Sequence, residues 1–214
     1  MISAQDALDR LQDGNRRFVA GLQNDEAQPH HLRRALTAQR QSPFAIILGC
    51  SDSRVPAEIV FDQGLGDLFV IRVAGNIVAP SQIGSVEFAA ENFDAPLVIV
   101  LGHSQCGAVL ATLESLRESP VQEQSESSRS IVDRIRPAVE HLLDSEYRDD
   151  PAVLCGSAVR ANVLASVNQL KHGSRILEQM IDEKRLHIVG AEYSLETGVV
   201  EFLQNEFSPR SDSK

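Results

Sequence analysis

Four short runs rich in apolar residues, separated by helical patterns, restrict the folds open to this chain. The runs cover residues 44–49, 67–73, 96–102 and 186–191. Short runs of this kind, bounded by polar residues, are typical of strands that are covered on both faces. Strands alternating with helices indicate an α/β protein, because parallel strands need a crossover segment between them. We therefore expect a mostly parallel β-sheet flanked by helices.

Helical patterns and turn signals account for most of the remaining chain. Residues 199–202 follow the last run closely and predict a β-hairpin with it. Residues 118–130 are polar and serine-rich and predict a loop. Predicted helices cover residues 3–20, 81–92, 107–117, 130–144, 151–172 and 174–184, with a further helix around His31 to Arg40.

The length of 214 residues fits one domain, and 43% hydrophobic residues are enough for a sizeable core. We expect a single domain over residues 1–207 and a polar tail over residues 208–214. Within the domain, residues 1–42 form a helical arm. Residues 43–207 form the α/β core, which carries the chemistry.

Charge and hydropathy exclude several classes of partner. The chain has 30 acidic against 20 basic residues, a formal net charge of −10. Nucleic acids and anionic membranes need a basic surface, so we expect neither as a partner. No apolar run approaches the roughly 20 residues of a membrane span. The first residues lack the basic-then-apolar pattern of a signal peptide, which predicts a cytoplasmic protein.

Reactive residues follow two of the apolar runs directly. Cys50 ends the first run, and His103-Ser104-Gln105-Cys106 ends the third. Because the carboxyl ends of parallel strands meet at one edge of a sheet, these side chains should lie together. Two thiolates and one imidazole suit Zn²⁺, and three ligands leave an open position, as in catalytic sites. Cys155, the third cysteine, is either a fourth, structural ligand or a buried apolar thiol, and its helical surroundings favour the second.

Two charged residues next to Cys50 strengthen the case for a reactive site. Asp52 can accept a hydrogen bond from a zinc-bound water or bind the metal, and Arg54 can hold its carboxylate with a bidentate pair. The alternative for these two residues alone is that Asp52 or Ser53 caps a helix beginning near Pro56. Arg54 would then form a surface ion pair.

With these motifs the sequence resembles the β-class carbonic anhydrases. Cys50-Ser51-Asp52-Ser53-Arg54 and His103-Ser104-Gln105-Cys106-Gly107 carry the resemblance, and residues 72–76 and 188–193 extend it. It implies four parallel strands with an added antiparallel edge strand. It also implies one zinc per chain on Cys50, His103 and Cys106, with Asp52 and Arg54 catalytic. The implied reaction is the reversible hydration of carbon dioxide to bicarbonate and a proton, by attack of zinc-bound hydroxide.

The resemblance also implies an assembly and a substrate pocket. The family forms homodimers, often paired into homotetramers, in which the N-terminal helix covers the partner subunit. Gln41 matches a glutamine that faces the neighbouring subunit's zinc, Phe69 and Phe88 match aromatic lining positions, and Gly107 would line the pocket. A subgroup binds inhibitory bicarbonate at a tryptophan, an arginine and a tyrosine. Arg72 and Tyr193 match the last two, but Ile47 replaces the tryptophan, so we expect this site to be weakened or absent.

Three other functions fit parts of this pattern. A zinc hydrolase of carbon disulfide or carbonyl sulfide would keep the fold and the motifs. A non-catalytic zinc-binding scaffold would need a fourth ligand and would have no use for Asp52 and Arg54. A thiol enzyme with Cys106 as nucleophile and His103 as base would work without metal.

Overall fold

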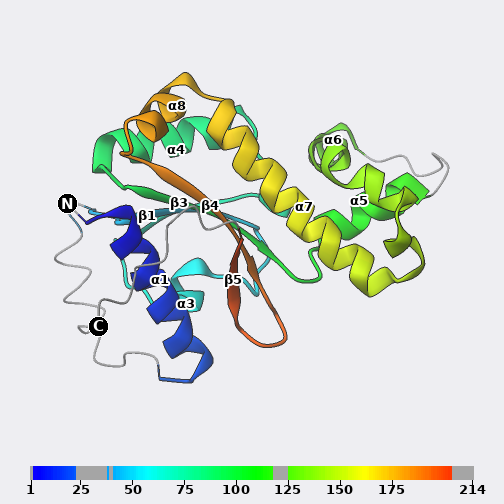
Figure 1. Ribbon diagram of the computed structural model, residues 1–214, viewed down its shortest axis with the longest axis horizontal. Coiled ribbons are helices and arrows are strands. Elements are labelled where there is room, and N and C mark those ends of the chain that lie inside the picture. The colour runs from blue at the N-terminus through cyan, green and yellow to red at the C-terminus, as the bar shows by residue number, and fades with distance from the viewer. Residues whose placement is uncertain (1, 23–37, 39–40, 118–124, 204–214) are drawn as a thin grey trace, which may run out of the picture.

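The computed structural model describes residues 2–22, 38, 41–117 and 125–203, and it has one five-stranded sheet at its centre (Figure 1). The strand order is β2-β1-β3-β4-β5. The first four strands pair in parallel and β5 pairs with β4 in antiparallel. This confirms the predicted class. The strands are β1 (Ala45–Gly49), β2 (Leu68–Arg72), β3 (Leu97–His103), β4 (His187–Tyr193) and β5 (Val200–Leu203).

The helices predicted over residues 3–20, 81–92, 107–117, 151–172 and 174–184 are confirmed to within two residues at each end. They are α1 (Ala4–Val19), α3 (Ala57–Val60), α4 (Pro80–Phe93), α5 (Gly107–Arg117), α6 (Glu126–Val139), α7 (Pro151–His172) and α8 (Arg175–Asp182). Three short 3₁₀ helices complete the described part: η1 (Ala74–Asn76), η2 (Glu140–Asp144) and η3 (Glu146–Asp149). None of the described helices is long and apolar enough to cross a bilayer. The helix predicted around His31 to Arg40 and the tail from residue 208 lie outside the described residues.

Two predicted boundaries around α6 were wrong. Residues 126–130, assigned to the serine-rich loop, are the first turn of α6, because the Ser125 hydroxyl accepts a hydrogen bond from the Ser128 amide and caps the helix. The same helix was expected to reach residue 144 but ends at Val139. Pro137 has no N–H and its ring crowds the preceding turn, so the chain continues as the 3₁₀ helix η2.

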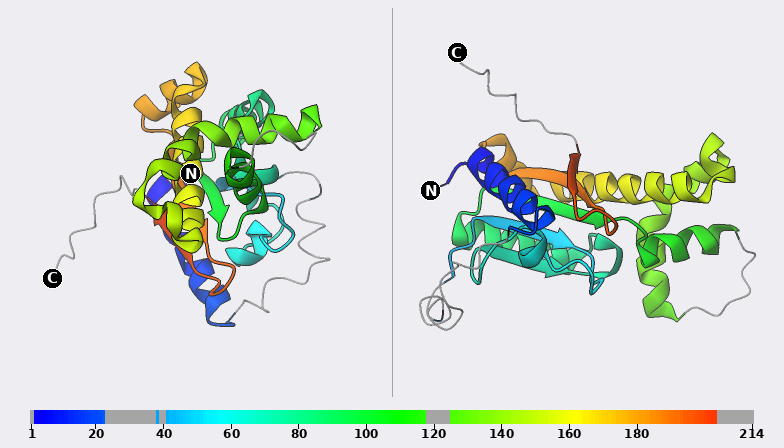
Figure 2. Two further views of the ribbon diagram at one scale, coloured as in Figure 1. Left: turned by 90° about the vertical axis from the view of Figure 1, so that its right-hand side faces the viewer. Right: turned by 90° about the horizontal axis from the view of Figure 1, so that it is seen from below.

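Alternate residues of the strands face two separate apolar layers. On one face, Ile47 of β1 and Ile99 of β3 pack with α1 and α3. On the other face, Ile46 and Leu48 pack with side chains from α4, α7 and α8. A third cluster joins α5, α6 and the first half of α7 (Figures 1 and 2) and includes Cys50 and Cys106. The two cysteines therefore lie where the helical group meets the sheet.

The apolar stripe of α1 packs against its own chain. Ala7, Leu8 and Leu11 are completely buried in the cluster that includes Phe61. Asn15 secures the contact from the same helix, since its side chain donates to the carbonyls of Val60 and Gly198. The resemblance implied that this helix covers the partner subunit, but its apolar stripe is buried against α3 and the sheet of its own chain.

We expect Gly14→Ala to destabilise the fold by about 1–3 kcal/mol, because a Cβ there would lie 1.8 Å from the Phe61 carbonyl oxygen. Alanine is otherwise the better helix former by roughly 1 kcal/mol. Gly84→Ala is the matched control, as Gly84 is exposed in α4 with nothing within 4 Å of its added Cβ. Urea unfolding of both variants measures the difference, and equal effects would contradict the close packing of α1.

Candidate metal centre

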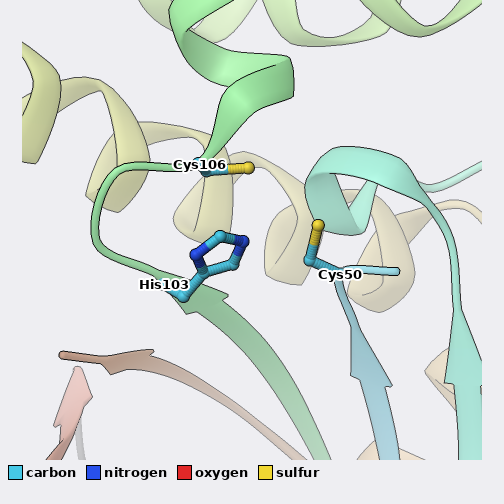
Figure 3. A group of neighbouring side chains, drawn as sticks. All are labelled: Cys50, His103 and Cys106. Atoms are coloured by element: carbon cyan, nitrogen blue, oxygen red, sulfur yellow. The ribbon is translucent and has the colours of Figure 1, made fainter. Parts of the chain in front are cut away.

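Three predicted ligand side chains meet at the carboxyl ends of β1 and β3. Cys50 directly follows β1, His103 is the last residue of β3 and Cys106 directly precedes α5. One donor atom from each lies within 4.8 Å of both others, and all three residues are buried. Figure 3 shows the two sulfur atoms and the imidazole turned towards a common space.

The imidazole of His103 is oriented as a metal ligand requires. Its Nδ1 donates to the carbonyl of Ser104 at 2.9 Å, which leaves Nε2 with a free lone pair. Within the described part of the chain, Nε2 is buried and has no hydrogen-bond partner. A buried nitrogen without a partner is costly, and a cation bound between it and two sulfurs would remove that cost. The donor set and this nitrogen together fit Zn²⁺.

The two thiols differ in their hold on the proton. The Cys106 thiol donates to Cys50, and this bond, with smaller contributions from His103 and nearby amides, holds the pKa of Cys50 well below its usual value against the effect of burial. The pKa of Cys106 is raised, first by the same hydrogen bond and then by burial. A metal that binds both sulfurs as thiolates displaces the thiol proton.

A tight turn beside β1 supports the Cys50 sulfur. The Gly75 amide donates to Sγ at 3.4 Å, and Gly75 and Asn76 both have positive φ, 67° and 43°. Two buried side chains of α7 hold the turn: Asn162 donates to the Gly75 carbonyl at 2.8 Å and Ser166 to the Asn76 carbonyl at 3.1 Å. Our sequence reading missed both residues. The available signal was a polar residue among apolar neighbours in α7.

Asp52 and Arg54 form the bidentate pair expected from the sequence. Arg54 Nε and Nη2 donate to the two carboxylate oxygens at 2.9 and 2.7 Å, and the Arg54 amide adds a third bond at 2.9 Å. Arg54 thereby holds the pKa of Asp52 far below its usual range. The alternative of a capping role was wrong, because α3 begins after Pro56 without a side-chain cap. Asp52 Oδ2 lies 3.9 Å from His103 Nε2, at the edge of the ligand cluster.

Comparison with known proteins agrees with the geometry. The family model described as "Carbonic anhydrase" matches residues 45–200. A carbonic anhydrase of Mycolicibacterium smegmatis is 42% identical over 191 residues, which is 89% of each chain. This chain belongs to the β-carbonic anhydrase family. Carbonic anhydrase 2 of Mycobacterium tuberculosis is 39% identical over 88% of this chain and 87% of its own. The solved β-carbonic anhydrase CcaA is 26% identical, with a TM-score of 0.74 over 92% of this chain and 94% of its own.

The residues proposed for the substrate pocket of this β-carbonic anhydrase are not all brought together in one chain. Gly107 begins α5 next to Cys106, and an added Cβ there would meet nothing within 4 Å. Phe69 pairs with Ile46 on β1. Ile46 comes four residues before Cys50, so Phe69 lies about 13 Å from the level of Cys50 along the strand direction. The rings of Phe69 and Phe88 instead pack against each other in a tilted arrangement, with their centroids 6.3 Å apart. Gln41 is exposed before β1, at the opposite end of that strand from Cys50.

Cys155 lies outside the ligand cluster. It is half-buried in α7, so it is neither the fourth ligand that a structural site would need nor the fully buried thiol that we expected. Its surroundings raise its pKa, first through burial, and the residue is therefore a poor thiolate.

Of the residues that match the family's inhibitory bicarbonate site, Arg72 is hydrogen-bonded to other groups and Tyr193 lies on a distant strand. Arg72 donates to the carbonyls of Cys50 and Asp52 at 3.0 and 2.5 Å, so its guanidinium supports the metal loop. Tyr193 is buried on β4, which is separated from β2 by β1 and β3, and these three strand spacings correspond to about 14 Å. Ile47 is completely buried between them on β1. Whether this site is weakened or absent in the protein stays a prediction.

Proposed function

We propose that this protein catalyses the zinc-dependent, reversible hydration of carbon dioxide to bicarbonate and a proton. The observation that carries the proposal is the arrangement of a cysteine–histidine–cysteine cluster with an arginine-held carboxylate beside it. Three ligands with one open side are typical of catalytic rather than structural zinc. Family membership, with relatives named carbonic anhydrase at 42% and 39% identity, supports the same reaction.

In this proposal Cys50, His103 and Cys106 hold one zinc ion per chain. When bound, zinc supplies a Lewis acid that lowers the pKa of water from about 15.7 towards neutrality. Two thiolates neutralise the ion, so we expect a weaker effect on water than three histidines would give. The Gly75 amide offsets part of the Cys50 charge through its bond to Sγ.

Asp52 and Arg54 orient the reacting groups. Asp52 Oδ2 lies 3.9 Å from the proposed ligand atom His103 Nε2, so the carboxylate can receive a hydrogen bond from the nucleophile and aim its lone pair at carbon dioxide. Arg54 keeps this carboxylate ionised and in place through three donors. Because these bonds occupy both oxygens, Asp52 is held towards Arg54 and not towards the ligand cluster.

The rival functions lack such support. A zinc scaffold needs four protein ligands, and the cluster found among the described residues has three. A thiol enzyme with Cys106 as nucleophile is not favoured either, because Cys106 is buried and meets Cys50 and His103 in an arrangement that fits a metal. Hydrolysis of carbon disulfide or carbonyl sulfide uses the same metal site and is not favoured by the relatives, which are named carbonic anhydrases.

We further propose a homo-oligomer, dimer or tetramer, in the cytoplasm. Gln41, Phe69 and Phe88 lie away from the cluster of their own chain, so they can line a substrate pocket only across a subunit boundary. The Sordaria macrospora β-carbonic anhydrases, 22% identical with a TM-score of 0.69, are described as tetrameric. Light scattering after size-exclusion chromatography measures the mass of the assembly, and a monomer would contradict the proposal.

The test of function is stopped-flow carbon dioxide hydration on zinc-quantified protein, from about pH 6.5 to about pH 9, where a zinc-activated water should titrate. We expect the rate to rise with pH. A rise steeper than one ionisation would indicate that the Asp52–Arg54 pair also opens and closes. No activity at any pH, with one zinc per chain, would overturn the proposal and direct attention to the sulfur-containing substrates.

A further inference from the structure

The loop between two of the proposed ligands consists of only Ser104 and Gln105. It must reverse the chain so that Cys106, at the start of α5, faces back towards His103 (Figure 3). The reversal places Gln105 in the left-handed region, with φ of 54°. A glutamine is strained there, because its Cβ crowds the backbone, and the conformation persists only if surrounding contacts hold it.

Two of those contacts come from one carboxylate that is remote in sequence. Glu196 lies in the turn between β4 and β5, and one of its oxygens accepts from the Ser104 hydroxyl at 2.8 Å. The other accepts from Gln105 Nε2 at 2.5 Å. Both residues of the ligand loop therefore donate to the same side chain, and each uses a different oxygen.

Two hydrogen bonds donated by backbone amides also connect the β4–β5 turn region to the ligand loop. The Ser104 amide donates to the carbonyl of Tyr193 at 2.9 Å, and the Leu195 amide donates to the Ser104 hydroxyl at 3.0 Å. The Ser194 hydroxyl adds a bond to Glu196 at 3.1 Å. The carboxylate is thus held at the position from which it restrains the loop.

We propose that Glu196 is a positioning residue that fixes the His103–Cys106 loop and thereby slows the loss of zinc. The inference rests on the proposed function, since it concerns the same metal site. Glu196 contacts the loop and none of the three ligand side chains. It acts by holding Gln105 in its strained conformation, which keeps the imidazole and the Cys106 sulfur at a fixed separation.

A glutamate suits this position better than its neutral analogue. Ser104 and Gln105 both present donors, so two acceptor oxygens are needed at once. Glutamine at position 196 offers one oxygen and one NH₂ group. One loop residue then faces this NH₂ group, so its bond survives only if the Ser104 hydroxyl accepts or the Gln105 amide turns over, and neither bond keeps the charge of the carboxylate.

The test is the rate at which zinc passes from the protein to a chelator such as dipicolinate. We expect Glu196→Gln to release zinc about 10-fold faster than the wild type, as removal of outer partners of metal ligands typically does. The cobalt-substituted protein should show altered thiolate-to-metal absorption. Glu201→Gln is the matched control, because Glu201 is an exposed carboxylate on the same hairpin that pairs with Arg160.

A second variant separates positioning from general stability. Ser104→Ala removes one of the two donors that Glu196 restrains. The double variant should therefore release zinc more slowly than expected if the effects of Ser104→Ala and Glu196→Gln on the release rate were independent. Equal release rates and cobalt spectra for Glu196→Gln and Glu201→Gln would overturn the inference. A wild-type protein that binds no stoichiometric zinc would overturn the proposed function and this inference with it.

Discussion

Replacing Cys106 by serine is expected to empty the proposed metal site and reduce carbon dioxide hydration to the uncatalysed background. The loss should be at least about 1000-fold, since zinc brings the pKa of water from about 15.7 to near 7 and no other group of the site can do so. A serine hydroxyl is a poor zinc ligand at neutral pH, and the remaining cysteine and histidine would be only two protein ligands, too few to hold the ion tightly. Metal analysis after dialysis and stopped-flow assays measure the two effects.

Cys155→Ser is the matched control for this variant. Cys155 is the remaining cysteine and lies outside the ligand cluster, so its replacement should leave both zinc content and rate close to those of the wild type. Retention of one zinc and full activity by the Cys106 variant would remove Cys106 from the ligand set. Full activity without zinc would instead support a metal-free mechanism.

Replacing Asp52 by asparagine should keep the zinc and lower the rate by about 100-fold, the upper end of what lost outer partners of a metal site cost. The asparagine side chain has one oxygen instead of two and no charge, so it cannot form the bidentate ion pair with the Arg54 guanidinium. Because Arg54 lowers the pKa of Asp52, the carboxylate is already ionised above its usual pKa near 4. It does not titrate between about pH 6.5 and about pH 9, so the variant should keep the shape of the pH profile at a lower amplitude.

Asp62→Asn provides a control with a comparable ion pair. The Asp62 side chain is 12% exposed and pairs with Arg17 at 2.5 Å, whereas that of Asp52 is 18% exposed. Its replacement breaks an arginine–carboxylate pair away from the ligand cluster and should leave kcat/KM unchanged. If Asp52→Asn were as active as Asp62→Asn at every pH, the orienting role of Asp52 would be wrong.

The sequence predicted the elements that depend on local patterns. The buried runs before Cys50 and His103 specified two adjacent parallel strands, and their shared edge brought the predicted ligands together. The bidentate Asp52–Arg54 pair was also predictable, because only one residue separates the two and their chemistry is complementary. The Ser174 hydroxyl, which accepts from the Leu177 amide and caps α8, is a local signal of the same kind.

The features that the sequence did not reveal depend on contacts between distant segments. Asn162 and Glu196 act on the site from 87 and 91 residues away from their partners, and no spacing rule connects such positions. The end of α6 was misplaced because Pro137 lies inside a helix and stops it only two residues later. The stripe of α1 was periodic, but its periodicity did not specify whether its own sheet or a partner would cover it.

The position of Asn162 and Glu196 late in the chain has a consequence for biosynthesis. All three proposed ligands have been translated by residue 106, before either residue exists. A nascent chain of that length lacks the clamp on Gly75, the restraint on Gln105 and the strand β4 that flanks β3. It carries two thiols and an imidazole on segments without their final neighbours. Since a domain folds as a unit, zinc insertion into a rigid site must await nearly complete synthesis.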